Sequence, residues 1–536
     1  MMKKRFLQSF VLLLALSLVL AACSSGDDSS DGGSNSDNDA AQTTLIYGRG
    51  ADSTSLDPAV VTDGESLKVT ENIFDTLLNY EEESTEVVAG LATEWKVSDD
   101  SLTYTFTLRE DVKFHDGTDF NADAVVYNFE RWMSGGTDGA YIYYAAMFGG
   151  FKEDAGHVIE SVTAVDPYTV EFKLKRPQAP FLKNLAMGPF GIASPTALEE
   201  NPDTFGENPV GTGPFVFKEW KRNDTITLER NSDYWGGEPK LEQVIFRVIP
   251  DNSARLTALK TGEIDLMDGV NPSDVSQVES DSSLQLLLRQ GMNIGYFGFN
   301  TEEEPFDDPK VRQALNHAVD KQAIIDAFYA GNAEAAVNPM PSFIPGYNDE
   351  IEGYEYDLEK AKALLAEAGY PDGFDMELWT FTNPRDYMPE PQKIAEAIQA
   401  EFAKINVNVE IITYDWTTFL EKVQNGEAQS FLVGWIGDNG DADNFLYVLL
   451  DQDSIDGNNY SRYANQELHD ILIAAQSETD EAARVELYKQ AQEIIHEDAP
   501  WIPLAHANAP LAAKSNLKGF VPHPTGLDKF TNAYFE

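Results

Sequence analysis

Short apolar runs typical of β-strands alternate with amphipathic helical segments from residue 43 to the C-terminus. Residues 102–108 have the composition of a strand, and residues 121–132 have the spacing of a helix. Strands that alternate with helices predict a mixed α/β fold in which helices cover the sheet. We detect no internal repeat, and 536 residues exceed the usual size of one domain. Two or three domains are therefore expected.

The second half of the chain has the clearest element boundaries. Apolar residues at helical spacing predict one helix over 310–328, and a second helix over 358–368 is ended by Gly369. A third helix is expected over 486–496, before Pro500 interrupts the pattern. Extended apolar segments between these helices predict the following strands: 377–381, 407–414 and 431–435.

The N-terminus has the features of an export signal. Lys3, Lys4 and Arg5 precede an apolar run over 10–20, which ends in small residues before the only cysteine, Cys23. This run is shorter than the roughly 20 residues of a membrane-spanning helix, so we expect residues 1–22 to be removed as a signal peptide. The small residues before Cys23 match the bacterial lipoprotein box, in which the cysteine becomes the acylated N-terminus.

This position of Cys23 favours lipidation over its two alternatives, a free thiol and an intermolecular disulfide. The chain is expected to be lipid-anchored at the extracytoplasmic face of the bacterial cell membrane, on the periplasmic side if the host has an outer membrane. Residues 23–42 are mostly Ser, Gly, Asp, Asn and Ala, a composition that predicts a disordered tether. With one cysteine, the fold contains no internal disulfide.

The charge and the missing motifs exclude several functions. The sequence has 38 Lys and Arg against 90 Asp and Glu, a net charge of −52, which repels nucleic acid. It contains no phosphate-binding Gly-rich loop ending in Lys-Ser/Thr, no His-Glu-x-x-His and no Gly-x-Ser-x-Gly. We therefore expect no ATP hydrolysis, no enzyme activity and no cofactor.

Two patterns that could indicate a metal are interpreted as structural. Residues 451–457 resemble a calcium loop, but Ile455 stands where an oxygen ligand is needed. His115 and His506 have no second histidine at ligand spacing. No metal site is predicted.

Four stretches of the chain together resemble the family 5 extracellular solute-binding proteins of bacterial ABC importers. The family includes receptors for oligopeptides, dipeptides, nickel and haem. The first stretch departs from the family pattern at Ser101, where Gly is usual, and at Ala124, where Asp is usual. The last stretch resembles the dipeptide-binding branch in particular. The stretches are 91–125, with its segments Leu-Ala-Thr-Glu-Trp and Phe-His-Asp-Gly, then 211–215, 311–315 and 434–445.

The resemblance implies a periplasmic-binding-protein-like fold of type II, in the large variant with an extra subdomain. Two α/β lobes joined by hinge strands would close over the ligand. The first lobe would comprise 43–290 plus 508–536, with a subdomain inserted at about 76–212, and the second lobe would comprise 291–507. The chain would cross the hinge near Gly291 and again near Ala505.

The same resemblance implies that the protein captures di- and oligopeptides and delivers them to a membrane permease with separate ATPase subunits, acting as a monomer. A short peptide is a zwitterion, so a buried site must provide an oppositely charged partner for both its ammonium and its carboxylate. Asp438 would bind the ammonium and Arg385 the carboxylate. Other residues expected at the ligand are Trp435, Tyr387, Trp416 and Gly434, with Thr62 and Gly64 facing it from the first lobe.

Several alternatives stay open at the level of the sequence. Asp438 could be only a turn residue, Arg385 could pair with Asp386, and Trp416 could belong to the core. Asp441 and Asp443 are interpreted as turn and helix-cap residues rather than ligands. The ligand could be glutathione, haem or nickel, and the protein could instead be a surface hydrolase or a peptide-sensing co-receptor.

Overall fold

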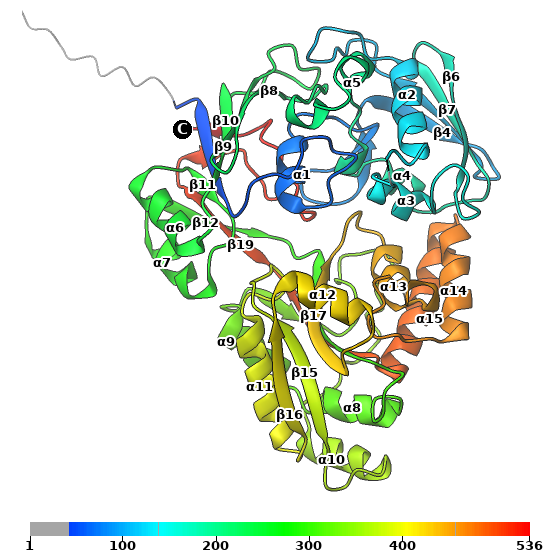
Figure 1. Ribbon diagram of the computed structural model, residues 1–536, viewed down its shortest axis with the longest axis vertical. Helices are drawn as coiled ribbons and strands as arrows, with labels where there is room; N and C mark the ends of the chain where they lie inside the picture. The colour runs from blue at the N-terminus through cyan, green and yellow to red at the C-terminus, as the bar shows by residue number, and fades with distance from the viewer. Residues whose placement is uncertain (1–41, 138, 456) are drawn as a thin grey trace, which may run out of the picture. The chain divides into compact units, whose positions relative to one another are not determined.

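Three large β-sheets organise the computed structural model, which describes residues 42–137, 139–455 and 457–536. Residues 42–536 form one compact unit, drawn with its helices and strands labelled in Figure 1. The predicted signal peptide, the lipidation site Cys23 and the tether up to residue 41 lie outside the described residues. None of the helices within the described ranges is long and apolar enough to span a bilayer.

The first sheet has seven strands in the order β12-β19-β11-β1-β10-β9-β8. β1 runs parallel to β10 and β11, and β19, from the last part of the chain, lies between β12 and β11. Three helices lie in the same part of the molecule as this sheet: α1 (Gly64–Thr70), α6 (Asn252–Thr261) and α7 (Val275–Ser280). The strands are β1 (Thr44–Arg49), β8 (Phe215–Lys221), β9 (Thr225–Arg230), β10 (Gln243–Val248), β11 (Leu266–Met267), β12 (Leu284–Arg289) and β19 (Ala509–Lys514).

The second sheet is a four-stranded antiparallel sheet in the order β4-β5-β7-β6. Its inner face packs on α2, where Phe129 meets Phe172 edge to face with ring centroids 4.7 Å apart. The α2 helix begins where the side chain of Asn121 accepts a hydrogen bond from the Ala124 amide. The elements of this region are β2 (Leu78–Tyr80), β3 (Val87–Ala89), β4 (Ala92–Val97), β5 (Thr103–Leu108), β6 (Ile159–Asp166), β7 (Thr169–Leu174), α2 (Ala122–Met133), α3 (Ile142–Phe148), α4 (Phe181–Asn184) and α5 (Pro195–Glu200).

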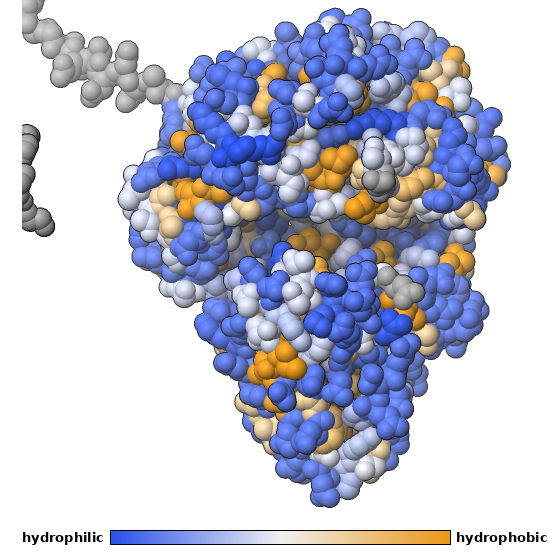
Figure 2. Space-filling model, in the orientation of Figure 1, coloured by the Kyte–Doolittle hydropathy of each residue, from blue (hydrophilic) through white to orange (hydrophobic). Residues whose placement is uncertain are grey.

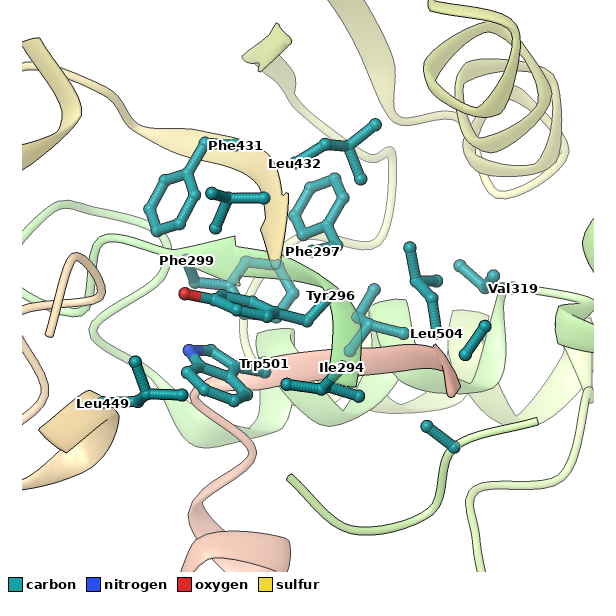
Figure 3. Close-up of a cluster of buried hydrophobic side chains, with 14 of the residues drawn as sticks. Ile294, Tyr296, Phe297, Phe299, Val319, Phe431, Leu432, Leu449, Trp501 and Leu504 are labelled. Carbon is teal, nitrogen blue, oxygen red and sulfur yellow. The ribbon is translucent and has the colours of Figure 1, made fainter. Parts of the chain in front are cut away.

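The third sheet has six strands in the order β14-β18-β13-β17-β15-β16. Its central strand β13 is buried along its whole length, and Figure 3 shows Tyr296 of β13 stacked on Trp501 of β18, with ring centroids 3.7 Å apart. The strands are β13 (Asn293–Phe299), β14 (Ala333–Ala335), β15 (Asp375–Phe381), β16 (Asn408–Tyr414), β17 (Ser430–Ile436) and β18 (Trp501–Ala507). The helices are α8 (Pro309–His317), α9 (Lys321–Phe328), α10 (Leu358–Glu367), α11 (Pro391–Ala403), α12 (Trp416–Gln424), α13 (Asp443–Leu450), α14 (Gln466–Ser477) and α15 (Glu481–Asp498).

The remaining elements are short. The C-terminal strands β20 and β21 pair antiparallel with each other. The short strands and 3₁₀ helices are β20 (Leu517–Lys518), β21 (Tyr534–Phe535), η1 (Gly188–Phe190), η2 (Phe205–Glu207), η3 (Pro272–Asp274) and η4 (Gln452–Ser454).

The prediction of one helix over 310–328 is wrong, because the chain forms two helices there. α8 ends at His317, and α9 begins at Lys321. Asp320 separates them, since its side chain accepts a hydrogen bond from the Ala323 amide at 3.0 Å and caps the new helix. The helix predicted over 486–496 is longer than expected and extends over α15.

The chain passes between the first and third sheets twice, and the two connections lie side by side. Residues 290–292 link β12 to β13, and Asn508 links β18 to β19. The Gly291 amide donates to Oδ1 of Asn508 at 3.0 Å, and the side chain of Asn293 bonds both the amide and the carbonyl of Ala507, at 2.9 and 2.8 Å. A Cβ at Gly291 would overlap the Ala507 carbonyl. The second connection therefore lies just beyond the predicted position near Ala505.

The buried cores fall on either side of these connections. The buried residues of one continuous core come from 292 to 507 only, and those of the others come from residues 45–284 and 511–535. The molecule is thus a two-lobed α/β protein. We call the lobe built on the third sheet the second lobe and the remainder the first lobe. The sequence-based boundaries at 290/291 and 507/508, and the inserted subdomain at about 76–212, stay predictions.

Candidate ligand-binding site

A cavity of about 940 Å³ lies between the two lobes. Figure 2 shows the hollow between them, with apolar residues gathered inside. All eight residues that the sequence places at a ligand line this cavity: Thr62, Gly64, Arg385, Tyr387, Trp416, Gly434, Trp435 and Asp438. Aromatic side chains make up much of the rest of its wall, namely Tyr80, Tyr143, Tyr234, Trp235, Tyr296 and Tyr460.

Asp438 is held by Asn444, a residue of the first turn of α13. The Asn444 amide nitrogen donates to Oδ2 of Asp438 at 3.0 Å, and its Oδ1 accepts from the Asp438 backbone amide at 3.0 Å. The same Oδ1 accepts from the indole of Trp435 at 2.9 Å. Asn444 therefore fixes the turn that follows β17 and aims the Asp438 carboxylate into the cavity. Sequence reasoning assigned no role to Asn444, although it belongs to the stretch 434–445.

The Asp438 carboxylate lacks a positive partner within the described part of the chain. Besides Asn444, it accepts one hydrogen bond from the phenol of Tyr143, 3.2 Å from Oδ1, which reaches across from α3 in the first lobe. Burial raises the pKa of Asp438 to about 6, and the two hydrogen bonds only partly offset that effect. A ligand ammonium would supply the missing charge.

Arg385 is also without an ion pair among the described residues. It lies in a tight turn in which its backbone bonds that of Met388, with N–O distances of 3.1 and 2.9 Å. Its guanidinium stacks over the ring of Trp416, 3.9 Å from the centroid, while its buried Nε has no hydrogen-bond partner. The alternative pairing with Asp386 does not form. The stacked, unpaired guanidinium offers its planar donors to a carboxylate.

Trp416, Tyr387 and Gly434 fit together around this turn. Trp416 packs edge-on against Phe381 of the core, with centroids 5.0 Å apart, and also lines the cavity, so it serves both of the roles that the sequence left open. The ring of Tyr387 lies directly on Gly434, where any side chain at residue 434 would overlap it. The Tyr329 phenol donates to the Tyr387 carbonyl at 2.9 Å and fixes this arrangement.

The first lobe contributes Thr62 and Gly64 at the start of α1. Asp63 between them caps the helix by accepting from the Ser66 amide at 2.8 Å. A Cβ built on Gly64 would meet no atom within 4 Å, so this position faces open space. Gly64 therefore leaves room for a ligand at the first-lobe wall.

Other first-lobe wall residues were missed by sequence reasoning. Buried Asp75 accepts hydrogen bonds from the phenol of Tyr234 at 3.0 Å and from the indole of Trp235 at 2.8 Å, which orients both rings at the cavity. Arg109 stacks on Trp235, 4.0 Å from a ring centroid. Asp75 and Arg109 lie far from Tyr234 and Trp235 in the sequence and share no local motif with them, so only the fold reveals this arrangement.

Direct contacts hold the two lobes closed beside the cavity. Lys183 Nζ donates to the Gly440 carbonyl at 2.6 Å, and the side chain of Asn439 donates to that of Asn184 at 2.8 Å. The Ala179 amide donates to the Gln476 carbonyl at 2.9 Å. Together with the bond from Tyr143 to Asp438, the first two contacts join α3 and α4 to the loop that follows β17, and the third joins the segment before α4 to α14.

Asp441 and Asp443 lie behind this loop and do not line the cavity. Asp441 accepts from the Asp443 amide at 3.0 Å, as a turn residue does, but it also forms a two-point ion pair with Arg484 at 2.7 and 2.8 Å. Asp443 is the first residue of α13 rather than its cap, because the capping position is Ala442. The cap predicted at Asp443 is therefore wrong by one residue.

One group of potential metal ligands occurs among the described residues: Asp451, Asp453 and His469. It overlaps the acidic stretch 451–457 and lies outside the cavity wall. His469 Nδ1 is 3.0 Å from Oδ1 of Asp451, so these two groups already pair with each other. His115 and His506 each bond a backbone carbonyl, of Gly213 at 3.0 Å and of Asn293 at 2.6 Å.

Comparisons with known proteins agree with this architecture. The model of the bacterial extracellular solute-binding proteins, family 5 middle region, matches residues 86–457. The dipeptide-binding protein of Escherichia coli (strain K12) is 38% identical over 512 residues, which cover 92% of this chain and 95% of that protein. Heme-binding protein A of Haemophilus influenzae is 38% identical over 543 residues, 98% of each chain.

Solved structures show the same likeness. The periplasmic binding protein DppA of Helicobacter pylori, in complex with the peptide STSA, superimposes with a TM-score of 0.78 at 40% identity, covering 92% of this chain and 98% of that one. HbpA2 of Haemophilus parasuis gives a TM-score of 0.83 at 37% identity, covering 92% and 100%. The fold and the cavity define a two-lobed solute-binding protein. The chain belongs to family 5 of the bacterial extracellular solute-binding proteins.

Proposed function

We propose that this protein captures short peptides outside the cytoplasm, delivers them to the permease of an ABC importer, and is not an enzyme. One observation carries the proposal: a carboxylate and a guanidinium, Asp438 and Arg385, line the same cavity, and neither has an ion-pair partner among the described residues. A zwitterionic ligand supplies both missing charges. Relatives named as dipeptide-binding proteins, and a similar structure holding Met-Leu, support peptides as that ligand.

The backbone of a bound peptide also finds a suitable surface. Strand β17 pairs with β13 along its whole length, but with β15 only where Phe431 faces Trp379. Residues 433–436 beyond that point line the cavity. An extended peptide lying here would bond to backbone groups rather than to particular side chains, so many sequences could bind. Its ammonium would face Asp438 and its carboxylate Arg385.

Haem and nickel fit the cavity wall less well than a peptide. His523 is the one histidine among the described lining residues, and both its ring nitrogens are engaged: Nδ1 lies 2.6 Å from the Thr525 hydroxyl, and Nε2 lies 3.1 Å from the Ser84 carbonyl. It is therefore not free to coordinate iron. The potential metal group around Asp451 lies elsewhere. Glutathione, a zwitterion like a peptide, is compatible with the same two anchors.

The anchoring and delivery steps complete the proposal. A lipid on Cys23 would hold the protein at the extracytoplasmic membrane face, and residues 23–42 would let it reach the importer. The protein would act as a monomer with a permease and separate ATPase subunits. Globomycin, which blocks lipoprotein signal processing, would then cause the precursor to accumulate, and Cys23→Ser would release the protein from the membrane.

The proposed function is tested by calorimetric titration of the purified protein with dialanine through pentaalanine. We expect Arg385→Ala to weaken dialanine binding about 100-fold, because the ligand carboxylate would be left desolvated and unpaired. Longer peptides should lose less affinity if their C-terminus passes Arg385. Dialanine amide, which lacks the carboxylate, should bind the native protein and Arg385→Ala equally weakly.

Three outcomes would contradict the proposal. Failure of every peptide to bind would remove the peptide assignment. Equal binding of dialanine and its amide by native protein would remove the role of Arg385. Peptide cleavage during incubation, lost in Asp438→Asn, would instead support the surface hydrolase.

Peptide affinity should fall as the solution becomes acidic. Because the pKa of Asp438 in the ligand-free protein is raised to about 6, a proton competes with the ammonium below that pH. The dissociation constant should rise about tenfold for each pH unit below about 6, and should be flat between there and about pH 8, where the peptide amine itself loses its proton. Titration from about pH 4.5 to 7.5 tests this, and a flat profile would contradict the role of Asp438.

A further inference from the structure

The charged residues of the cavity wall do not balance once a peptide backbone is bound. Asp438 would pair with the ammonium of the peptide, and Arg385 would pair with its carboxylate. Glu71 and Lys529 neutralise each other, with their charged atoms 3.2 Å apart. Two carboxylates, Glu81 and Glu82, then remain on the wall. Neither forms an ion pair with any of the described residues, so the occupied cavity would carry two uncompensated negative charges.

Glu81 and Glu82 lie on a loop that the structure holds firmly at the cavity. They follow β2 in the turn that leads to β3, and the backbone of this turn is anchored by His523, whose Nε2 lies 3.2 Å from the Glu81 carbonyl. The ring of Tyr80 stacks on His523 with centroids 5.9 Å apart. The other end of the turn places buried Thr85 against Gly440 of the second lobe.

The side chains of these two glutamates make only weak neutral contacts. Glu81 accepts from the Ser84 hydroxyl at 3.5 Å, and Glu82 accepts from the Asn532 amide at 3.2 Å. The nearest cations are committed elsewhere: Lys529 pairs with Glu71, and Lys183, which lies outside the wall, bonds the Gly440 carbonyl. Both carboxylates are exposed, so they can meet a ligand without a large desolvation cost.

We propose that Glu81 and Glu82 make this receptor selective for peptides with a basic side chain, lysine or arginine, over neutral and acidic ones. This inference depends on the proposed peptide-binding function and adds the class of side chain to it. The protein's net charge of −52 acts in the same direction, because its field attracts cationic ligands and repels anionic ones. The wall glutamates add a local contribution that depends on where the ligand side chain lies.

The test compares matched dipeptides that differ in one charge. We expect Ala-Lys or Lys-Ala to bind the purified protein about three- to tenfold more tightly than the corresponding glutamine peptide, the range for one or two exposed ion pairs. The glutamate peptides should bind more weakly by a similar factor. Raising the salt concentration to about 1 M should reduce both differences, because exposed charges are then screened.

Two double variants separate the effect of Glu81 and Glu82 on the cavity wall from the effect of the protein's net charge. Glu81→Gln with Glu82→Gln should reduce the preference for lysine peptides to the part that the net charge of the protein supplies. It should change dialanine binding far less, because dialanine has no charged side chain. Glu199→Gln with Glu200→Gln removes the same net charge from exposed residues at the end of α5, outside the cavity wall, and should retain the preference.

The outcomes distinguish this inference from the function on which it depends. If no dipeptide binds, the proposed function itself is wrong. If dialanine binds but lysine peptides have no advantage over glutamine peptides, only the selectivity is wrong. A preference that is undiminished in the Glu81/Glu82 variant, or that falls equally in the Glu199/Glu200 variant, would also overturn the assignment to these two glutamates.

Discussion

Replacing Asp438 by asparagine is expected to abolish peptide binding and, at the same time, to make the ligand-free protein more stable. Asparagine keeps the shape: its oxygen can still accept from Asn444, and its NH2 group can donate to the Tyr143 phenol oxygen in place of the native bond. It has no charge for the ligand ammonium. Loss of one partner from such a buried pair costs about 2–5 kcal/mol, or about 30- to 5,000-fold in affinity. Stability should rise because the native carboxylate is charged at neutral pH in a site that disfavours the charge.

The direction of the stability change depends on pH. The pKa of Asp438 is raised from 3.8 to about 6 in the folded protein, so the folded state binds the proton more tightly than the unfolded state. Stability associated with this group is present below about pH 4 and is lost as the pH rises through about 6. A shift of about two pKa units corresponds to about 1–3 kcal/mol at neutral pH. Asp438→Asn removes that penalty.

Differential scanning calorimetry measures both effects. Without peptide, Asp438→Asn should melt a few degrees above the native protein at about pH 7 and equally with it at about pH 4. Dialanine should raise the melting temperature of the native protein only. Asp441→Asn in the same loop is the control with the opposite sign, because the Arg484 guanidinium compensates burial and lowers the pKa of Asp441. A lower melting temperature for Asp438→Asn at neutral pH would contradict the prediction.

Much of the second lobe could be predicted because its signals are local. The strands expected over 377–381, 407–414 and 431–435 correspond to β15, β16 and β17 within two residues at each end. α10 ends before Gly369, which has a φ of +94° that favours glycine. The error at 310–328 was also local, since Asp320 followed by helix-forming residues is an N-cap signal that competed with the apolar spacing.

The candidate site could be predicted only where one stretch of chain carries it. Gly434, Trp435 and Asp438 share a strand end, and the motif places them together. The phenol of Tyr143 lies 295 positions from Asp438 in the sequence, and Asp75 lies 160 positions from Trp235. Contacts of this kind arise from the closure of two lobes whose relative placement has no local signal. Glu81 and Glu82 were missed for the same reason.

The substitution Gly440→Ala is expected to have the second large effect on peptide binding, because it interferes with closure of the two lobes. Gly440 has a φ of +64°, and a Cβ built there would overlap the side chain of Thr85 on the first lobe. The methyl group cannot be accommodated while the lobes are closed, whereas an open form would tolerate it. We expect the variant to favour the open form and to bind peptide about 10- to 100-fold more weakly, since closed molecules would be a minor population.

Two controls separate the clash between the lobes from backbone strain at residue 440. Gly117→Ala has the same kind of strain, with a φ of +86°, but a Cβ there meets no atom within 4 Å. It should lower stability by about 1 kcal/mol and leave affinity unchanged. Gly440→Ala combined with Thr85→Gly should restore affinity without removing the strain. Small-angle scattering should show a larger radius of gyration for Gly440→Ala alone. If Gly440→Ala binds peptide like the native protein, the contact between Gly440 and Thr85 does not control closure.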